Sequence, residues 1–97
     1  MEVVLLIENK NLEKVKEVLL KDDEVSRASI TFKDARVLMN KEGYYCYISG
    51  TDSQCKKAIE LVKGLSKKIE NEEEREVIKR IKEEENRANL GFGSIFG

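Results

Sequence analysis

The hydrophobic and polar positions along this chain repeat with different periods, and each period predicts a type of secondary structure. Residues 2–8, EVVLLIE, are almost continuously apolar, which is typical of a strand buried on both faces. Residues 25–33 alternate in polarity and residues 44–49 are rich in aromatic positions, which predicts two further strands. After Asn11 and after Thr51, apolar residues recur at helical spacing behind a residue that can cap a helix. The predicted order of these elements is β-α-β-β-α.

The two faces of the predicted sheet differ in what is available to cover them. Because successive side chains of a strand point to opposite sides, one face collects apolar residues from all three strands. These residues are Val3, Leu5, Ile7, Ala28, Ile30, Phe32, Tyr44, Cys46 and Ile48. The opposite face carries Val4, Leu6, Tyr45 and Tyr47, together with Thr31. If both predicted helices pack on the first face, the second face stays open, although it is too apolar to remain fully hydrated.

The segment between the second and third predicted strands allows two interpretations at its start. Residues 36–39 fit either a short strand or a single helical turn. Residues 40–43, NKEG, predict a hairpin loop, because Gly43 can adopt a positive φ without steric cost.

The last third of the chain is strongly charged. Asn71 followed by three glutamates predicts an N-cap with its capping box. Glu76–Arg80 and Glu83–Arg87 have the i,i+4 spacing of favourable helical ion pairs. This third helix either begins at Asn71 or continues from the preceding helix through Ser66. Because its apolar residues are few, we expect ion pairs to support it more than burial does.

The complete pattern predicts one α+β domain, residues 1–88, with the order β-α-β-β-α-α and a Gly/Phe-rich C-terminal tail, residues 89–97. We expect a mixed or antiparallel sheet with helices on one face and a charged C-terminal helix. This order resembles a ferredoxin-like unit whose last strand is replaced by the charged helix. A chain of 97 residues is long enough to form one domain with its own core.

Composition narrows the functional class. Charged residues make up 38% of the chain and no run approaches the ~18 apolar residues of a membrane span, so we expect no membrane association. The net charge of −1 gives no overall attraction to nucleic acid. The first ten residues lack the basic region of a signal peptide, so we expect a cytoplasmic protein. Abundant Lys and Glu, with a single Gln, resemble the composition of thermophile proteins.

Residue types that carry catalysis or bind metals are scarce. The chain has no histidine, the commonest general base and transition-metal ligand. Without histidine, Cys46 and Cys55 make a poor zinc site and are expected to be two small buried thiols. No P-loop is present, and no GxGxxG motif opens a helix after a strand. Adjacent glutamates on a helix point in different directions and so do not converge on one ion. We therefore expect no enzymatic activity, no cofactor, no metal site and no small-molecule substrate.

The C-terminal segment NLGFGSIFG places large apolar residues among glycines. These residues are Leu90, Phe92, Ile95 and Phe96. Full burial of each such side chain contributes roughly 1.5–3 kcal/mol, so burial against another surface is favoured. The segment either folds back across its own sheet, inserts into a partner protein or a second copy of the chain, or stays disordered. Insertion into a partner is the interpretation we favour.

These features predict a small non-catalytic subunit or adaptor that binds a partner protein, or itself as a homodimer. The expected contacts are the four apolar tail residues with Tyr45 and Tyr47 of the open sheet face. The alternative is single-stranded RNA binding, because residues 43–48, GYYCYI, resemble the RNP1 strand of RRM domains. That resemblance implies a platform on which Tyr45 and Tyr47 stack bases, beside Arg27 and Lys33. Glu42 stands where the motif opens with Lys or Arg.

Overall fold

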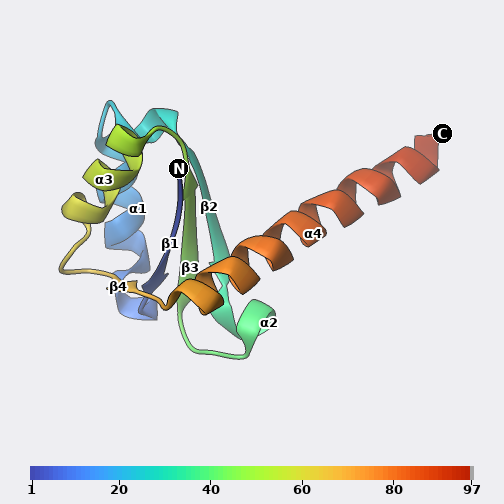
Figure 1. Ribbon diagram of the computed structural model, residues 1–97, viewed down its shortest axis with the longest axis horizontal. Coiled ribbons are helices and arrows are strands. Elements are labelled where there is room, and N and C mark those ends of the chain that lie inside the picture. Colours follow the sequence, from blue (N-terminus) through green and yellow to red (C-terminus); the bar gives the residue numbers. More distant parts are fainter. Residues whose placement is uncertain (97) are drawn as a thin grey trace.

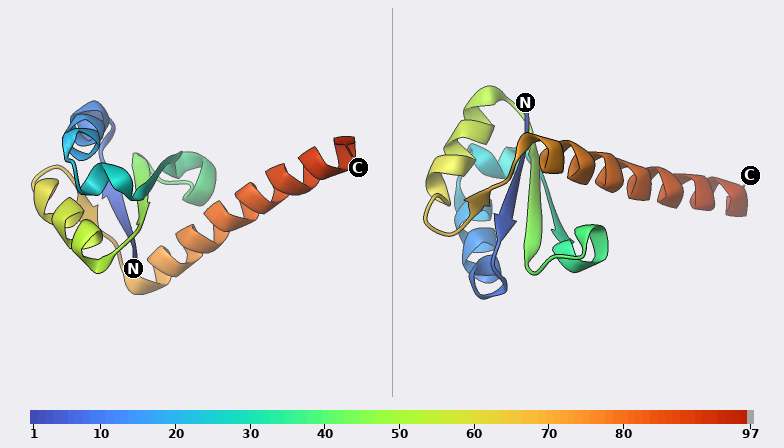
Figure 2. Two further views of the ribbon diagram at one scale, coloured as in Figure 1. Left: turned by 90° about the horizontal axis from the view of Figure 1, so that it is seen from above. Right: turned by 60° about the horizontal axis from the view of Figure 1, so that its bottom comes forward.

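The computed structural model describes residues 1–96, and describes side chains for residues 1–86. It is an α+β fold built on a four-stranded antiparallel sheet (Figures 1 and 2). The strands are β1 (Glu2–Ile7), β2 (Ser29–Asp34), β3 (Tyr44–Ser49) and β4 (Lys67–Lys68). The helices are α1 (Leu12–Lys21), α2 (Ala35–Met39), α3 (Asp52–Leu61) and α4 (Asn71–Phe96), with 3-10 turns η1 (Asn9–Asn11) and η2 (Val25–Arg27).

The strand order is β2-β3-β1-β4, which is the order of a ferredoxin-like sheet. α1 connects β1 to β2, and α3 connects β3 to β4. The sequence predicts that the last strand of this fold is missing, and this is wrong. Lys67 and Lys68 form a short fourth strand that pairs with Leu6 and Leu5 of β1. Two residues are too few to show an alternating pattern, so periodicity does not detect this strand.

The first face of the sheet is covered by α1 and α3, as the sequence predicts. The buried residues between these layers are Val3, Leu5, Ile7, Val15, Leu19, Val25, Cys46, Ile48, Cys55, Ala58 and Val62. The prediction of two buried thiols is confirmed, since Cys46 and Cys55 are both free and fully buried. Burial raises the pKa of Cys46 to about 12, so this thiol stays protonated and poorly nucleophilic at neutral pH.

The second face is covered too, which corrects the prediction that helices lie on one face only. α2 and the first turns of α4 pack against it (Figure 2). The buried residues of this second core are Val4, Ala35, Leu38, Tyr45, Tyr47, Val77 and Ile81. Val77 and Ile81 of α4 have no exposed surface. Burial therefore contributes more to the charged helix than its composition indicates.

Several element boundaries differ from the pattern-based prediction. β2 begins at Ser29 rather than at Val25, because η2 occupies the preceding residues. The ambiguous segment after β2 is helical, and Asp34 caps it by accepting from the Arg36 N–H at 2.9 Å. α4 is separate from α3, and the Glu74 N–H bonds to the Glu70 carbonyl at 2.9 Å. Asn71 is therefore the first helical residue rather than the N-cap.

We predict that Gly43→Ala destabilises the protein by about 1–3 kcal/mol, because Gly43 has a φ of 104° that a residue with a Cβ rarely adopts. A Cβ there also lies 2.6 Å from the Ile7 carbonyl oxygen. Gly64→Ala is the matched control, since its Cβ meets nothing within 4 Å, and it should leave stability unchanged or slightly raised. Urea unfolding followed by circular dichroism measures both, and equal effects would contradict the prediction.

We predict that Ile81→Ala lowers the free energy of unfolding by about 2–5 kcal/mol, because it opens a cavity under a fully buried side chain of α4. Glu83→Ala on the exposed side of the same turns should change it by less than about 0.5 kcal/mol. The same unfolding assay applies. A negligible effect of Ile81→Ala would mean that α4 does not pack on the sheet in solution.

Candidate protein-interaction surface

Tyr45 and Tyr47 share the second face of β3, as the sequence predicts, but they are not open to a partner. Their exposed fractions are 0% and 7%. The Tyr45 hydroxyl donates to Glu73 Oε2 at 2.7 Å, and the Tyr47 hydroxyl donates to Glu2 Oε1 at 2.8 Å. Burial, reinforced by these carboxylates, raises the pKa of Tyr47 to about 12 and raises that of Tyr45 further. The predicted open platform of two tyrosines is therefore wrong, because α4 and α2 cover the rings.

Two glutamates attach the start of α4 to the sheet. Glu73 Oε1 lies 2.6 Å from Lys41 Nζ, while its other oxygen accepts from Tyr45. The hydrogen bond from Lys41, and to a smaller extent the one from Tyr45, holds the pKa of Glu73 below its ordinary value. Glu74 Oε2 accepts from the backbone N–H of Val4 at 3.1 Å, one position beyond the part of β1 that pairs with β4. These carboxylates are structural contacts rather than a solvated acidic run.

Further contacts hold α4 as it crosses the sheet. Arg80 donates to the carbonyl of Leu38 in α2, and its Nε lies 2.9 Å from Glu76, which confirms that predicted ion pair. Lys82 Nζ donates to Glu2 Oε1 at 3.1 Å. Hydrogen bonds from Tyr47 and then from Lys82 lower the pKa of Glu2.

α4 crosses the sheet from the β4 edge, where it begins, to the β2 edge. Glu84 Oε1 lies 3.9 Å from Lys33 Nζ of β2, the edge strand. Beyond this point α4 extends past β2 and α2 in all three views (Figures 1 and 2). The residues from Lys82 to Asn86 are exposed. α4 thus has an anchored first part and a projecting second part.

The predicted tail, residues 89–97, is largely included within the bounds of α4. The side chains proposed to bind a partner there are Leu90, Phe92, Ile95 and Phe96, and they lie outside the residues whose side chains the structure describes. The same holds for the predicted Glu83–Arg87 pair. Their contacts therefore stay predictions from the sequence.

The sequence does not predict the attachment of α4 by Glu73 and Glu74. The only signal is the spacing of Val77, Ile78 and Ile81, which places three apolar residues on one side of a helix. That stripe indicates that one side of α4 is covered. It does not indicate which surface covers it, because the spacing describes only the helix itself.

A shallow groove of about 470 Å³ lies between α2 and α4. Its lining residues are Val37, Leu38, Glu76, Lys79, Arg80, Glu83 and Glu84. Val37 is 78% exposed, while the charged residues around it carry both signs. Over the part of the chain with described side chains, no cluster of His, Cys, Asp or Glu is arranged to hold a metal ion.

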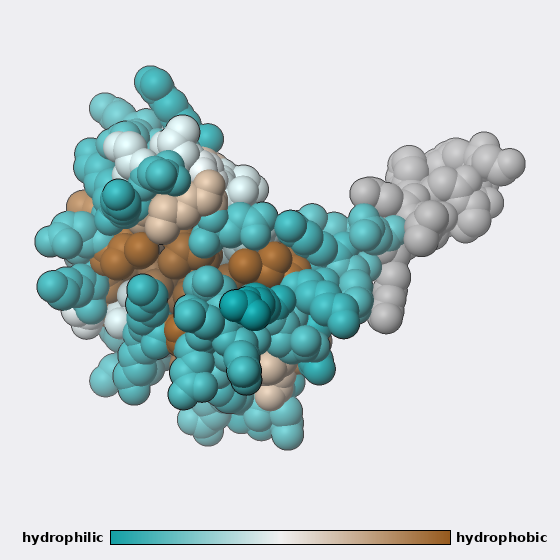
Figure 3. All heavy atoms as spheres, viewed as in Figure 1, coloured by the Kyte–Doolittle hydropathy of each residue, from teal (hydrophilic) through white to brown (hydrophobic). Residues whose placement is uncertain are grey.

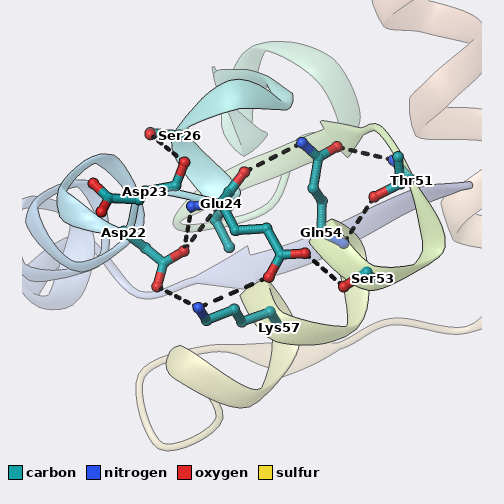
Figure 4. A network of polar contacts seen from close by, with 9 residues as sticks. Asp22, Asp23, Glu24, Ser26, Thr51, Ser53, Gln54 and Lys57 are labelled. Atoms are coloured by element: carbon teal, nitrogen blue, oxygen red, sulfur yellow. Dashed lines mark hydrogen bonds and ion pairs between the residues drawn. The ribbon is translucent and has the colours of Figure 1, made fainter.

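A polar network joins the end of α1 to the start of α3 (Figure 4). Thr51 and Gln54 form the predicted capping box, with the Gln54 N–H donating to Thr51 Oγ1 at 3.1 Å. Gln54 Nε2 also donates to the carbonyl of Glu24 at 3.2 Å, and Lys57 Nζ lies 3.0 Å from Asp22 Oδ2. These polar groups bind one another and fix the two helix ends, so their arrangement is explained by stability.

The surface of the body is mainly polar, with an apolar band across the middle of the face shown in Figure 3. Four large hydrophobic residues within residues 1–86 are clearly exposed, namely Met1, Leu20, Val37 and Leu61. In the same part of the chain, no helix is both long and apolar enough to cross a membrane. Comparisons of the chain with family models, with curated proteins and with solved structures found no match.

We predict that Glu73→Gln lowers the free energy of unfolding at pH 7 by about 1–3 kcal/mol, because the carboxylate accepts from Lys41 and Tyr45. Since folding lowers the pKa of Glu73 from 4.5, its contribution is complete above that pH and is lost as the pH falls through the folded value. The difference between the two proteins should therefore narrow below pH ~4.5. Urea unfolding between pH 3 and pH 7 measures it.

Glu72→Gln, on the exposed neighbour in the same helical turn, is the control for Glu73→Gln and should match the unchanged protein at every pH. A difference for Glu73→Gln that stays constant down to pH 3 would show that its charge does not hold α4.

Proposed function

We propose that this chain is a small non-catalytic interaction subunit that binds a partner protein through the projecting part of α4. The observation that carries the proposal is the division of α4 into an anchored and a projecting part. The anchored part reaches Glu84 at the edge of the sheet, and the helix continues to Phe96 beyond it (Figure 1). A helix that leaves its own domain is suited to the groove of another protein.

The anchor gives the projecting helix a defined direction. Val77 and Ile81 are fully buried against the second face of the sheet. Glu73 and Glu74 add bonds to a side chain of β3 and to the backbone of β1. Because these contacts hold the first turns of α4, a partner that binds the projecting part does not need to order the whole helix, which lowers the entropic cost of binding.

The sequence of the projecting part supplies the apolar side chains that a groove needs. They are Leu90, Phe92, Ile95 and Phe96. Each contributes roughly 1.5–3 kcal/mol on full burial, so a partner that buries even some of them gains several kcal/mol. These residues follow the acidic residues Glu83–Glu85, which favours a partner groove with basic residues at its rim.

The non-catalytic character of the proposal rests on the chemistry of the chain. The sequence has no histidine, and both thiols are buried between the sheet and the layer of α1 and α3. The hydroxyls of Tyr45 and Tyr47 are bound to carboxylates that position α4. Single-stranded RNA binding through these two tyrosines would first require α4 to leave the second face of the sheet.

We predict that deleting residues 90–97 abolishes capture of the partner while leaving the domain folded, because Glu84 makes the last anchoring contact of α4 among residues 1–86. Affinity purification from the native cell, with the complete and the shortened chain as bait, measures capture, and thermal unfolding measures folding. Leu20→Ala is the control, since it removes an exposed apolar residue on α1, in the layer opposite α4. It should retain the partner.

Two results would contradict the proposed function. One is capture of the same protein by the shortened chain. The other is unfolding of the shortened chain, which would place the last residues in the core of the domain.

A further inference from the structure

We propose that β2 pairs with β2 of a second copy of this chain, so that two four-stranded sheets join into one continuous antiparallel sheet. The inference is independent of the partner proposed for α4. It rests on the outer edge of β2, with which no element pairs in the part of the chain that the structure describes.

The hydrogen-bond pattern of the sheet identifies the groups that face outward from β2. The Ala35 N–H bonds to the Gly43 carbonyl at 2.9 Å, in continuation of the register between β2 and β3. In an antiparallel pair, every second residue exchanges both backbone bonds with its partner strand. Residues 29, 31 and 33 therefore bond to β3, and the N–H and C=O groups of Ile30 and Phe32 point away from the sheet.

The other edge of the sheet is closed against such pairing. β4 has only two residues, and both are lysines. Next to it, the Val4 N–H is occupied by the Glu74 carboxylate at 3.1 Å. A short strand and edge lysines are devices by which proteins prevent the edges of sheets from pairing with another chain.

The edge formed by β2 is neither short nor protected by charge at its centre. It has six residues in unbroken register with β3, without a bulge. The chain has no proline. The single lysine of the strand, Lys33, lies near its end and is 3.9 Å from Glu84 of the same chain. The centre of the edge, from Ile30 to Phe32, is uncharged.

The central residues of β2 are complementary to themselves. When two copies are related by a two-fold axis at Thr31, Ile30 of one copy lies opposite Phe32 of the other, and both have outward backbone groups. Each of these two symmetric pairs exchanges two backbone hydrogen bonds. Ile30 and Phe32 are only half-buried in the single chain and point to the same face, so they cover each other across the axis. Ser29 then lies opposite Lys33.

The two-fold axis keeps equivalent faces of the two sheets on the same side. α1 and α3 of both copies therefore cover one side of the joined sheet, and the α4 helices lie on the other. α4 passes over this same edge near Lys33 and extends past β2 (Figure 2). In the joined pair its projecting part therefore lies beside the second copy. Two paired strands alone bury less than the ~1,200 Å² of a small stable interface, so we expect a dissociation constant in the micromolar range.

The oligomeric state of the complete chain tests the proposal. Light scattering after size exclusion, or sedimentation equilibrium, from about 5 µM to about 500 µM should show the mass rising from 11.1 kDa toward twice that value. A mass that stays at one chain up to the highest concentration overturns the proposal.

Cysteine cross-linking tests the register. In the proposed pair the two Thr31 residues face each other without backbone bonds, with Cα atoms about 4.5 Å apart, which a disulfide can span. Thr31→Cys should therefore form a covalent dimer under mild oxidation. Lys33→Cys is the matched control and should not, because the two Lys33 residues lie about 13 Å apart along the paired strands. The native thiols are buried and do not interfere.

Charge complementation supplies a second, independent measurement. Thr31→Lys and Thr31→Glu each place like charges across the axis, so each variant alone should dimerise up to about fivefold more weakly. An equimolar mixture should regain association, because opposite charges then face each other. Circular dichroism first shows that each variant is folded. Two results would then overturn the register. One is cross-linking of Lys33→Cys equal to that of Thr31→Cys, and the other is a mixture of Thr31→Lys and Thr31→Glu that associates no more tightly than either variant alone.

Discussion

The packing of the first turns of α4 on the second face of the sheet is the constraint on which the rest of this structure depends. The contact joins Val77 and Ile81 to the second core, while Glu73 and Glu74 satisfy Tyr45 and a backbone group of β1. An apolar stripe alone would leave the hydroxyl of Tyr45 buried without a partner, and carboxylates alone would give an exposed, weak attachment. The combination makes the charged helix a third layer of the domain. It also removes the tyrosines from any role as an open platform.

The same contact gives the molecule its asymmetry. α4 begins beside β4, where lysines and a carboxylate close one edge of the sheet, and it leaves over β2, whose edge remains available. Both proposed interaction surfaces therefore lie on one side of the domain (Figure 1). A second copy paired with β2 would lie next to the helix that we propose enters a partner protein. Two copies would then present two such helices, and binding to a partner with two grooves would gain from their proximity.

The titratable groups of the core support stability rather than reactivity. Burial raises the pKa of Cys46 and of both core tyrosines, so these groups remain neutral and act as packing elements or hydrogen-bond donors. Glu2 and Glu73 have lowered pKa values because each accepts from a tyrosine and a lysine. In the pairs Tyr45–Glu73 and Tyr47–Glu2, a neutral hydroxyl of the second core donates to an ionised carboxylate at its rim. These bonds hold the elements around the second core together.

The sequence by itself determined the local elements of this protein, and the tertiary structure decided which surfaces remained exposed. Periodicity predicted the three long strands, and it placed the side chains of Val4 and Tyr45 on the opposite face of the sheet from that of Cys46. The residue types at Thr51 and Gln54 predicted the capping box. These features depend on neighbouring residues only. The two-residue β4 escaped detection because it exists only through pairing with β1. The covered second face escaped detection for the same reason. Whether a helix whose first turns carry three apolar residues projects into water or lies on a sheet depends on the path of the chain after β4. Contacts between distant residues such as Glu74 and Val4 fix that path.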